Sequence, residues 1–297
     1  YGTIYDLLKA HLITTSHPHE STVDFLAPVL QEQWAQGGLP EPERSELALR
    51  QFQFFAAELP YGNPFPDQPE EATVARTRVL LHQFSNVDQF YQVMVSDANR
   101  QHPSIQFERE YPASAALVRN SFEVPGAFTR AGWETVQASL QNIDQLFARE
   151  DWVVGERAVS AEDRVRLAQE LRARYVADYI AHWRDYLRAA SVVRGTNVGG
   201  IAEALERLSS NESPLLQMLA LAARNTDVDS AAVAPAFQPV HVVMPPSVTD
   251  RFVTDANAPY ISALASLQAA LQQVASANGP ARQAAMDQAI SEADRVR

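Results

Sequence analysis

The chain has 297 residues, of which 46% are hydrophobic and 20% charged, and this composition excludes a globally disordered protein. Its formal net charge of −12 argues against binding to the phosphates of nucleic acid or to anionic lipid. Because cysteine is absent, disulfides, thiolate metal sites and a cysteine nucleophile are excluded within this sequence.

Neither end of the sequence has the features of a natural terminus. It opens at Tyr1 without a methionine or a signal peptide, and residues 294–297 continue a helical pattern. We therefore expect a segment of a longer protein. A membrane anchor would lie outside it, because no apolar run here reaches the about 18 residues that span a bilayer.

Apolar residues at helical spacing predict that most of the chain is helical. In chain order, helices are expected over 4–12, 23–35, 43–59, 69–85, 87–98 and 131–150. The sharpest pattern follows over residues 167–190, where large apolar residues recur every four positions and charged residues occupy the opposite side. These apolar residues are Leu167, Leu171, Tyr175, Tyr179, Trp183 and Leu187.

The last third of the chain predicts further helices and a hairpin. After a helix over 201–208, Ser213 and Pro214 have the residue types of an N-cap and a first helical position. Apolar residues between Tyr260 and Val274 alternate steps of four and three, and Asn278-Gly279-Pro280 then turns the chain into a final helix. We expect these two helices to form an αα-hairpin.

Strand signals are few. Ile105, Phe107 and Tyr111 are separated by even numbers of positions, with polar residues at 106, 108 and 110. Residues 240–244 form a β-branched run between prolines, which indicates an edge strand or an isolated extended stretch. Residues 226–250 are rich in loop-forming residues. The predicted fold class is mainly α, with two helical subdomains in tandem and one or two short strands or extended segments.

Few residues have a pattern that indicates chemistry. His17-Pro18-His19-Glu20, with His11 nearby, is the densest group of metal-ligand types, but two histidines flanking a proline diverge in an extended loop. We interpret it as a polar linker. His182 lies beside the apolar stripe of the long helix and is expected to be a partly buried, hydrogen-bonded side chain. We predict no catalytic residue, metal site or cofactor.

The stretch from Phe122 to Trp133 has unusual local features. Pro125-Gly126 is a strong turn signal, and Thr129 can cap the helix that follows. Gly132 in the first turn of that helix is unfavourable unless another group approaches closely or the helix starts later. The favoured interpretation is a structural junction between subdomains, and the alternative is a ligand site.

Residues 124–133 resemble the "VPG-(F/Y)-(Y/F)-T-R-x-G-W" segment of the ImcF-related region in the TssM/IcmF family, the inner-membrane scaffold proteins of type VI secretion. Other segments agree in order. Residues 5–12 are similar to the family's "Y-x-x-L-K-A-Y-L" opening, residues 152–155 to its "W-V-L-G", and residues 171–187 to its "L…Y…DYI…W…L" helix. The likeness extends to about Thr226. His11 departs from it, standing where the family usually has tyrosine.

The resemblance implies two regions and a set of structural residues. Residues 1–157 would be an ImcF-related helical domain, and residues 158–297 the helical first part of the IcmF C-terminal region, with the loop-rich stretch near 226–250. The structural motif would comprise Pro125, Gly126, Thr129, Arg130, Gly132, Trp133, Tyr175, Asp178, Tyr179 and Trp183.

The resemblance also implies a role and partners. The chain would be a non-enzymatic scaffold segment, the periplasmic portion of an inner-membrane protein that links inner- and outer-membrane components. Its partners would be sister copies, an outer-membrane lipoprotein (TssJ) that binds outside this segment, and an inner-membrane partner (TssL), with no nucleic acid and no small-molecule substrate. The alternatives are an envelope-associated hydrolase, which requires a pocket with converging titratable groups, and a generic helical protein-binding module.

Overall fold

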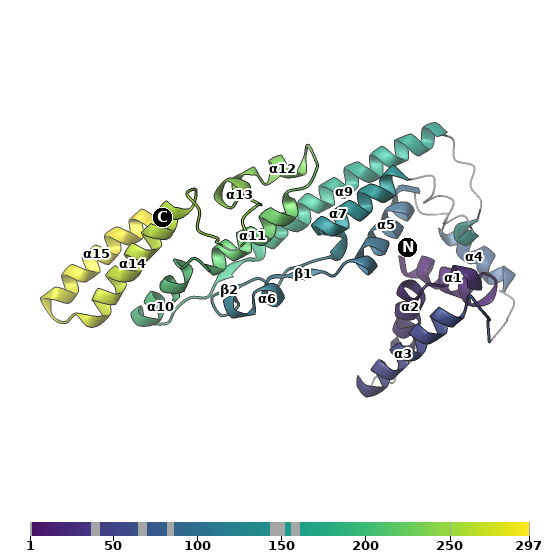
Figure 1. The fold of residues 1–297 in the computed structure, drawn as a ribbon, viewed down its shortest axis with the longest axis horizontal. Coiled ribbons are helices and arrows are strands. Elements are labelled where there is room, and N and C mark those ends of the chain that lie inside the picture. Colours follow the sequence, from purple (N-terminus) through teal and green to yellow (C-terminus); the bar gives the residue numbers. More distant parts are fainter. Residues whose placement is uncertain are drawn as a thin grey trace. The chain divides into compact units, whose positions relative to one another are not determined.

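The computed structural model describes residues 2–36, 42–64, 70–81, 86–142, 152–155, 161–249 and 251–296. These residues are mainly helical, as the sequence predicts, and the strands among them are two residues long (Figure 1). The chain divides into two compact units whose segments alternate along the sequence. Unit 1 contains residues 1–103 and 134–175, and unit 2 contains residues 104–133 and 176–297.

The two compact units differ from the two regions, 1–157 and 158–297, that the sequence suggests. The suggested boundary at 157/158 falls inside the second segment of unit 1, and residues 104–133 belong with residues 176–297. The regions 1–157 and 158–297 therefore stay a prediction about the family's sequence organisation. They do not coincide with the compact units.

The first segment of unit 1 holds α1 (Gly2–Thr15), the 3-10 turn η1 (Pro18–Glu20), α2 (Val23–Gln36), α3 (Pro42–Glu58), α4 (Glu71–Leu81) and α5 (Asn86–Gln101). Helices α2 and α3 lie side by side (Figure 1). Their shared core with α1 is formed by Ala10, Ile13, Phe25, Leu26, Val29, Ala56 and Leu59. Burial of these side chains on one face of each helix is the main force that holds the three helices together.

Unit 2 begins with short elements. They are β1 (Ile105–Gln106), α6 (Phe107–Glu110), η2 (Pro112–Ser114), β2 (Val118–Arg119), β3 (Glu123–Val124) and η3 (Gly126–Phe128). Strand β1 pairs antiparallel with β3, placing Ile105 opposite Val124, and β2 pairs antiparallel with β4 (Ser191–Val192), placing Val118 opposite Val192. The strand expected around Ile105 is therefore confined to two residues, because a helical turn follows at Phe107.

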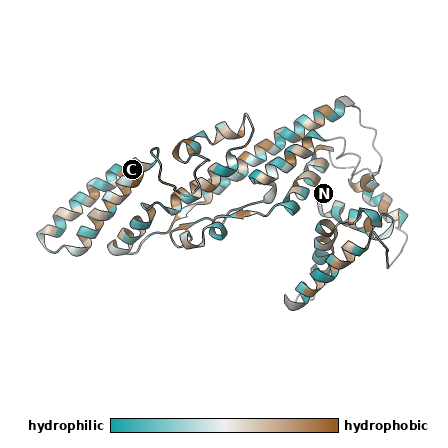
Figure 2. Ribbon diagram, viewed as in Figure 1, coloured by the Kyte–Doolittle hydropathy of each residue, from teal (hydrophilic) through white to brown (hydrophobic). Residues whose placement is uncertain are grey.

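Two longer helices, α7 (Arg130–Gln141) and α9 (Ala161–Ala189), each contribute residues to both units. The apolar stripe expected on α9 is confirmed, since Leu171, Tyr175, Tyr179 and Trp183 are all fully buried. Apolar and polar residues alternate along this helix in Figure 2. The predicted helix ends at 82–85 and 143–150 lie outside the described residues.

The rest of unit 2 comprises α10 (Val198–Leu208), α11 (Pro214–Thr226), α12 (Val233–Ala236), α13 (Gln238–Val243), α14 (Ala258–Ser276) and α15 (Pro280–Val296). Helices α14 and α15 form the predicted hairpin, and α10 packs against α14. Gly279 makes the turn with a φ of +58°, a conformation that glycine adopts without strain.

The extended stretch expected over 240–244 is wrong, because these residues belong to α13 and its C-terminal cap. Pro239 lies in the first turn of that helix, where its missing N–H would have had no helical partner in any case. The backbone N–H groups of Val240 and His241 both donate to the carbonyl of Phe237. Proline on the N-terminal side of this run therefore starts a helix and does not border a strand.

Candidate functional site

The segment from Pro125 to Trp133 forms a 3-10 turn that leads directly into α7. The N–H of Phe128 donates to the carbonyl of Pro125 over 2.9 Å. Thr129 then caps α7 as predicted: its hydroxyl accepts from the N–H of Gly132 over 3.1 Å and donates to the carbonyl of Gly126 over 2.7 Å. Such a cap stabilises a helix by about 1 kcal/mol.

Gly132 allows two parts of the backbone to lie unusually close together. A Cβ atom at this position would lie 2.1 Å from the carbonyl oxygen of Gly126 and 2.7 Å from the Cα of Ala127. Real side chains do not tolerate such distances, so only glycine fits. The sequence leaves two explanations for this glycine, a close approach or a later helix start, and the structure shows the close approach, which is made by η3.

Aromatic side chains of α9 lie against this segment. The indole Nε1–H of Trp183 donates to the carbonyl of Phe128 over 2.8 Å. The rings of Trp133 and Tyr179 meet edge to face, with centroids 5.0 Å apart and an interplanar angle of 79°. Because Trp183 and Tyr179 have no exposed surface, these contacts are made in a dry environment where an unpaired polar atom would be costly.

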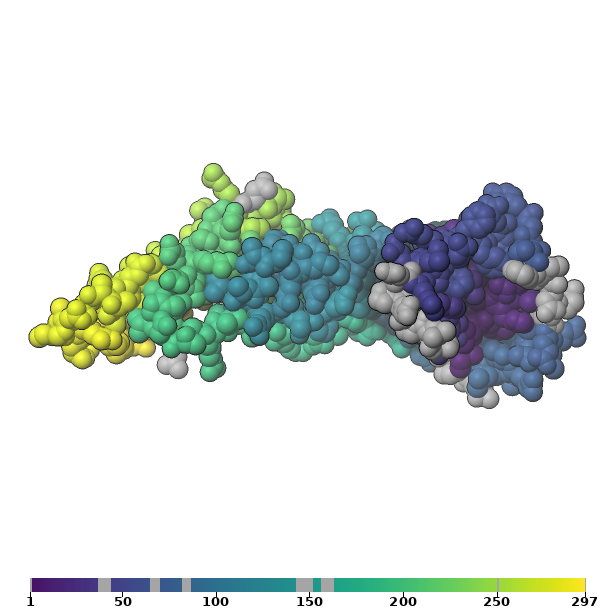
Figure 3. All heavy atoms as spheres, turned by 90° about the horizontal axis from the view of Figure 1, so that it is seen from below, coloured from purple at the N-terminus to yellow at the C-terminus, as the bar shows by residue number. Residues whose placement is uncertain are grey.

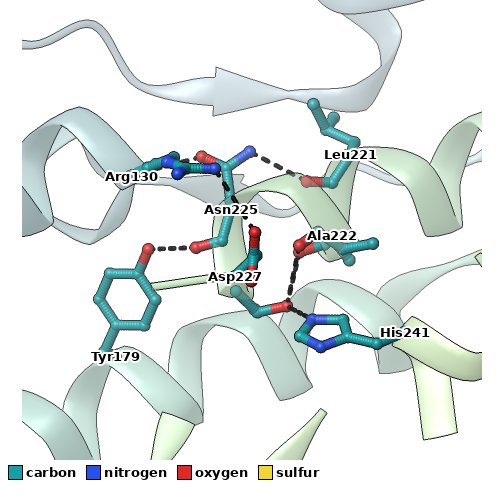
Figure 4. Close-up of polar contacts among 9 residues, drawn as sticks. Arg130, Tyr179, Leu221, Ala222, Asn225, Asp227 and His241 are labelled. Atoms are coloured by element: carbon teal, nitrogen blue, oxygen red, sulfur yellow. Dashed lines mark hydrogen bonds and ion pairs between the residues drawn. The ribbon is translucent and has the colours of Figure 1, made fainter. Parts of the chain in front are cut away.

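The C-terminal end of α11 completes the arrangement (Figure 4). Asn225 accepts a hydrogen bond at its side-chain oxygen from the N–H of Arg130, over 3.0 Å, and donates through its amide to the carbonyl of Leu221, over 2.9 Å. Its own backbone carbonyl accepts from the hydroxyl of Tyr179. One buried asparagine thus joins α7, α9 and α11. We call residues 125–133 with Tyr179, Trp183 and Asn225 the Thr129 cluster.

Two titratable side chains, Tyr179 and Arg130, belong to the Thr129 cluster. Burial raises the pKa of Tyr179, so its phenol stays protonated and donates. The guanidinium of Arg130 lies 3.8 Å from the carboxylate of Asp227, but both side chains are half exposed, so this pair contributes little stability.

His241 lies next to the cluster, on α13. The hydroxyl of Thr226 donates to the carbonyl of Ala222 over 2.8 Å and therefore accepts from Nε2–H of His241, also over 2.8 Å (Figure 4). Burial lowers the pKa of His241, while the nearby Asp227 opposes this effect. This contact connects α13 to the end of α11.

The remaining predicted residues of α9 also have structural contacts. His182 is half-buried, its ring stacks on Phe128 with centroids 3.9 Å apart, and its Nδ1–H donates to the carbonyl of Asp178 over 2.8 Å. This confirms the expected hydrogen-bonded histidine. Tyr175 is fully buried and belongs to unit 1, whereas Asp178 belongs to unit 2.

Unit 1 contains a cavity of about 260 Å³ with charged walls. The Nζ of Lys9 and the Cζ of Arg100 lie 5.0 Å and 5.1 Å from the centroid of the Phe25 ring. Arg100 pairs with Asp97 on the same helix, and burial raises the pKa of Asp6 against the opposing effect of Arg100. Lys9 and Arg100 thus contact other residues that line the cavity, through cation–π and ion-pair contacts that join α1, α2 and α5.

Of the two histidines that the sequence singles out, His17 packs against an aromatic ring and His19 lies at the surface. The ring of His17 stacks on Trp152 with centroids 4.7 Å apart, and its Nδ1 lies 2.7 Å from the hydroxyl of Ser16. Burial lowers the pKa of His17. The Nε2 of His19 lies 3.6 Å from the carboxylate of Glu20, at the surface.

Residues 2–36, 42–64, 70–81, 86–142, 152–155, 161–249 and 251–296 were considered together for metal-binding groups and membrane-spanning helices. Within them, no group of three or more histidine, aspartate or glutamate side chains is arranged to hold a metal ion. In the same ranges, no helix combines the length and the apolar character needed to cross a bilayer.

Sequence reasoning missed Asn225 and His241. Asn225 stands in a polar run at the end of α11, where an exposed cap would be expected, and its partner Arg130 lies 95 residues away. The apolar character of the preceding residues was the only local signal that the end of this helix is buried.

Comparison with known proteins gives three similarities. The family model described as "IcmF-related: Intracellular multiplication and human macrophage-killing" matches residues 1–227. The type VI secretion system component TssM1 of Pseudomonas aeruginosa is 38% identical over 105 residues, which are 35% of this chain and 9% of the relative. The chain thus spans a small part of that protein's length.

The third similarity is to a solved structure. A chain of a type VI secretion system membrane core complex superimposes with a TM-score of 0.51 over 66% of this chain and 38% of that chain, at 20% identity. At this identity the likeness concerns the fold alone. The family match covers most of the sequence and includes the whole Thr129 cluster. From these findings the chain belongs to the TssM/IcmF (IcmF-related) family.

Proposed function

We propose that this chain is a structural segment of a type VI secretion membrane complex and catalyses no reaction. The observation that carries the proposal is the Thr129 cluster, in which Asn225, Thr129 and Trp183 satisfy buried backbone groups from separate elements. A fully satisfied buried network makes packing unique and rigid. Rigidity suits a component that transmits force, and family membership supplies the setting.

The use of the polar side chains supports the same proposal. The residues with catalytic or ligand-binding potential, such as His17, His182 and Arg100, contact aromatic rings or backbone carbonyls of the chain itself. A catalytic pair would instead converge on a shared space next to a cleft. These contacts therefore support a structural role more than the alternative role of a hydrolase.

The proposal includes a location and partners. The chain would lie in the periplasm as part of an inner-membrane-anchored protein, linking inner- and outer-membrane components. It would contact sister copies and the inner-membrane partner TssL, while the lipoprotein TssJ would bind outside this segment. The relatives' membership of a membrane complex supports these partners, and the net charge of −12 disfavours nucleic acid.

Location can be tested with single cysteines, because this segment has none. In a cysteine-free version of the full-length protein, Gln53→Cys places a thiol at an exposed position. A maleimide that cannot cross the inner membrane should label it in intact spheroplasts as completely as after lysis. Labelling only after lysis would place this segment in the cytoplasm and contradict the proposed location.

The structural role can be tested in a strain that lacks its own copy of the full-length protein. Gly132→Ala, which disrupts the Thr129 cluster, should reduce both recovery of the assembled membrane complex and secretion. His19→Gln and Glu20→Gln alter exposed polar side chains and should leave both unchanged. Loss of secretion in Glu20→Gln with an intact complex would contradict a purely structural role.

A further inference from the structure

Helix α3 carries an apolar stripe on the side that faces away from its core contacts. Leu47, Phe54 and Tyr61 are exposed by 58%, 66% and 88%. Leu47 and Phe54 are spaced by seven residues, nearly two helical turns, and so share one face of the helix, while Tyr61 lies in the turn that follows its end. On the opposite face, Ala56 and Leu59 are buried in the core shared with α2. Helix α3 (dark blue) lies at the surface in Figure 3.

The residues beside this stripe have an ordered pattern of charge. Arg44, Gln51 and Glu58 are also spaced by seven residues and form an exposed row next to Leu47 and Phe54. The row has a cation at one end, a neutral amide in the middle and a carboxylate at the other end. Read in the reverse direction, the row is its own electrostatic complement.

This complementarity identifies the occupant of the stripe. If a second α3 runs antiparallel and a two-fold axis passes near Gln51, Arg44 of each copy faces Glu58 of the other, because both lie seven residues from the axis. Leu47 and Phe54 then lie beside Phe54 and Leu47 of the second copy. A parallel pair would instead place Arg44 against Arg44 and Glu58 against Glu58, which is repulsive.

We propose that α3 is an interface between copies of this chain, formed by antiparallel pairing of α3 about a two-fold axis at Gln51. An interface of this symmetry uses the same patch on both copies, as the self-complementary row requires. The biological setting of this inference rests on the proposed scaffold role. Helix α3 has 17 residues, and a single helix pair of that length buries less than the about 1,200–2,000 Å² of a stable interface.

The pair is therefore weak between isolated chains and gains strength when other contacts of an assembly raise the effective concentration. A covalent trap suits such a contact better than a measurement of oligomeric state. Because the chain has no cysteine, one introduced thiol reports on one position. Gln51→Cys lies at the proposed axis. Gln53→Cys is the control, because it is also exposed and lies on the same helix, about 200° further round it.

With a short bis-maleimide, purified Gln51→Cys should form covalent dimers several-fold faster than Gln53→Cys. Adding Phe54→Ser should remove this difference, and circular dichroism should show an unchanged fold, since Phe54 is exposed. Equal rates for the two cysteines would overturn the proposed pairing.

Charge reversal tests the direction of the pair. In the Gln51→Cys background, Arg44→Glu and Glu58→Arg should each slow cross-linking, because each creates like-charged contacts. The double variant restores opposite charges across the axis and should recover the original rate. A double variant as slow as the single ones would exclude the antiparallel arrangement.

These measurements use the purified chain, so their failure would overturn the α3 interface and leave the proposed scaffold role standing. Failure of the labelling or secretion tests in cells would overturn the proposed role without affecting the cross-links.

Discussion

The Thr129 cluster and the α14–α15 hairpin, both in unit 2, are held together in different ways. The cluster combines large aromatic side chains with buried hydrogen bonds, such as that from Trp183 to the carbonyl of Phe128. The hairpin has a core of small side chains, comprising Ala270, Val274, Ala285 and Ala289. Small side chains let two helices approach closely, but each buries little apolar area.

This contrast predicts where the chain tolerates change. In the cluster, the side chains of Thr129, Tyr179, Trp183 and Asn225 combine burial with a hydrogen bond to a specific backbone group, so one substitution loses both. In the hairpin, stabilisation is spread over many similar contacts. Substitutions in the cluster should therefore cost more free energy of unfolding than substitutions in the hairpin.

The largest effect is expected for Trp183→Ala. It removes a fully buried indole and leaves the carbonyl of Phe128 without its donor, so it should lower the free energy of unfolding by about 3–5 kcal/mol. Urea unfolding followed by circular dichroism measures this change. Arg184→Ala, at the exposed neighbouring position, should cost almost nothing. Similar losses of unfolding free energy in the two variants would contradict the claim that the cluster is a major source of stability.

Gly132→Ala should have the second largest effect. The added methyl group collides with the carbonyl of Gly126, and overpacking of this kind costs about 1–3 kcal/mol. Gly199→Ala in α10 is the matched control, since its nearest neighbour, the side-chain oxygen of Asn197, lies at an ordinary 3.5 Å. The control should be neutral or stabilising by up to about 1 kcal/mol. Thermal unfolding should show a lower midpoint for Gly132→Ala than for Gly199→Ala, and equal midpoints would contradict the proposed collision.

Val274→Ala tests the hairpin. The loss of two methyl groups from a buried side chain should cost about 1.5 kcal/mol, which is below the cost of Trp183→Ala and in the lower part of the range for Gly132→Ala. The exposed Gln273→Ala provides the baseline. If Val274→Ala proved as costly as Trp183→Ala in urea unfolding, the contrast between the two regions would be wrong.

The smallest effect concerns pH and His241. Burial lowers its pKa, so the folded chain favours the neutral imidazole. This stabilisation is complete above the ordinary pKa of about 6.5 and is lost as the pH falls towards the lower folded-state pKa, because the unfolded chain binds the proton first. Thermal midpoints measured on either side of pH 6.5 should differ less in His241→Gln than in the original chain. Burial also lowers the pKa of His17, so this side chain should add to the same loss of stability at low pH. His17→Gln should therefore reduce the difference between the two midpoints in the same way as His241→Gln.

Much of the fold follows from periodic patterns in the sequence. The four-residue recurrence through Tyr175, Tyr179 and Trp183 predicts the buried face of α9, because helical geometry alone places these residues together. Thr129 likewise predicts a cap, whereas Gly132 indicates either a close approach or a later helix start, of which the structure shows the first.

Other features depend on partners that are distant in the sequence. The sequence predicts an extended stretch where the structure has the short helix α13. A short run of valines favours a strand unless tertiary contacts, such as that between His241 and Thr226, favour a helix. The role of Asn225 depends on its contacts with Arg130 and Tyr179, and no local pattern reveals that these residues meet.

The alternation of chain segments between the two units constrains how this region can be divided. The chain passes from one unit to the other after residues 103, 133 and 175. A protease that cuts once cannot release either unit whole. A chimera of two family members joined at residue 157 would assemble unit 1 from two parents. To keep unit 1 intact, a chimera should take residues 1–103 and residues 134–175 from the same parent.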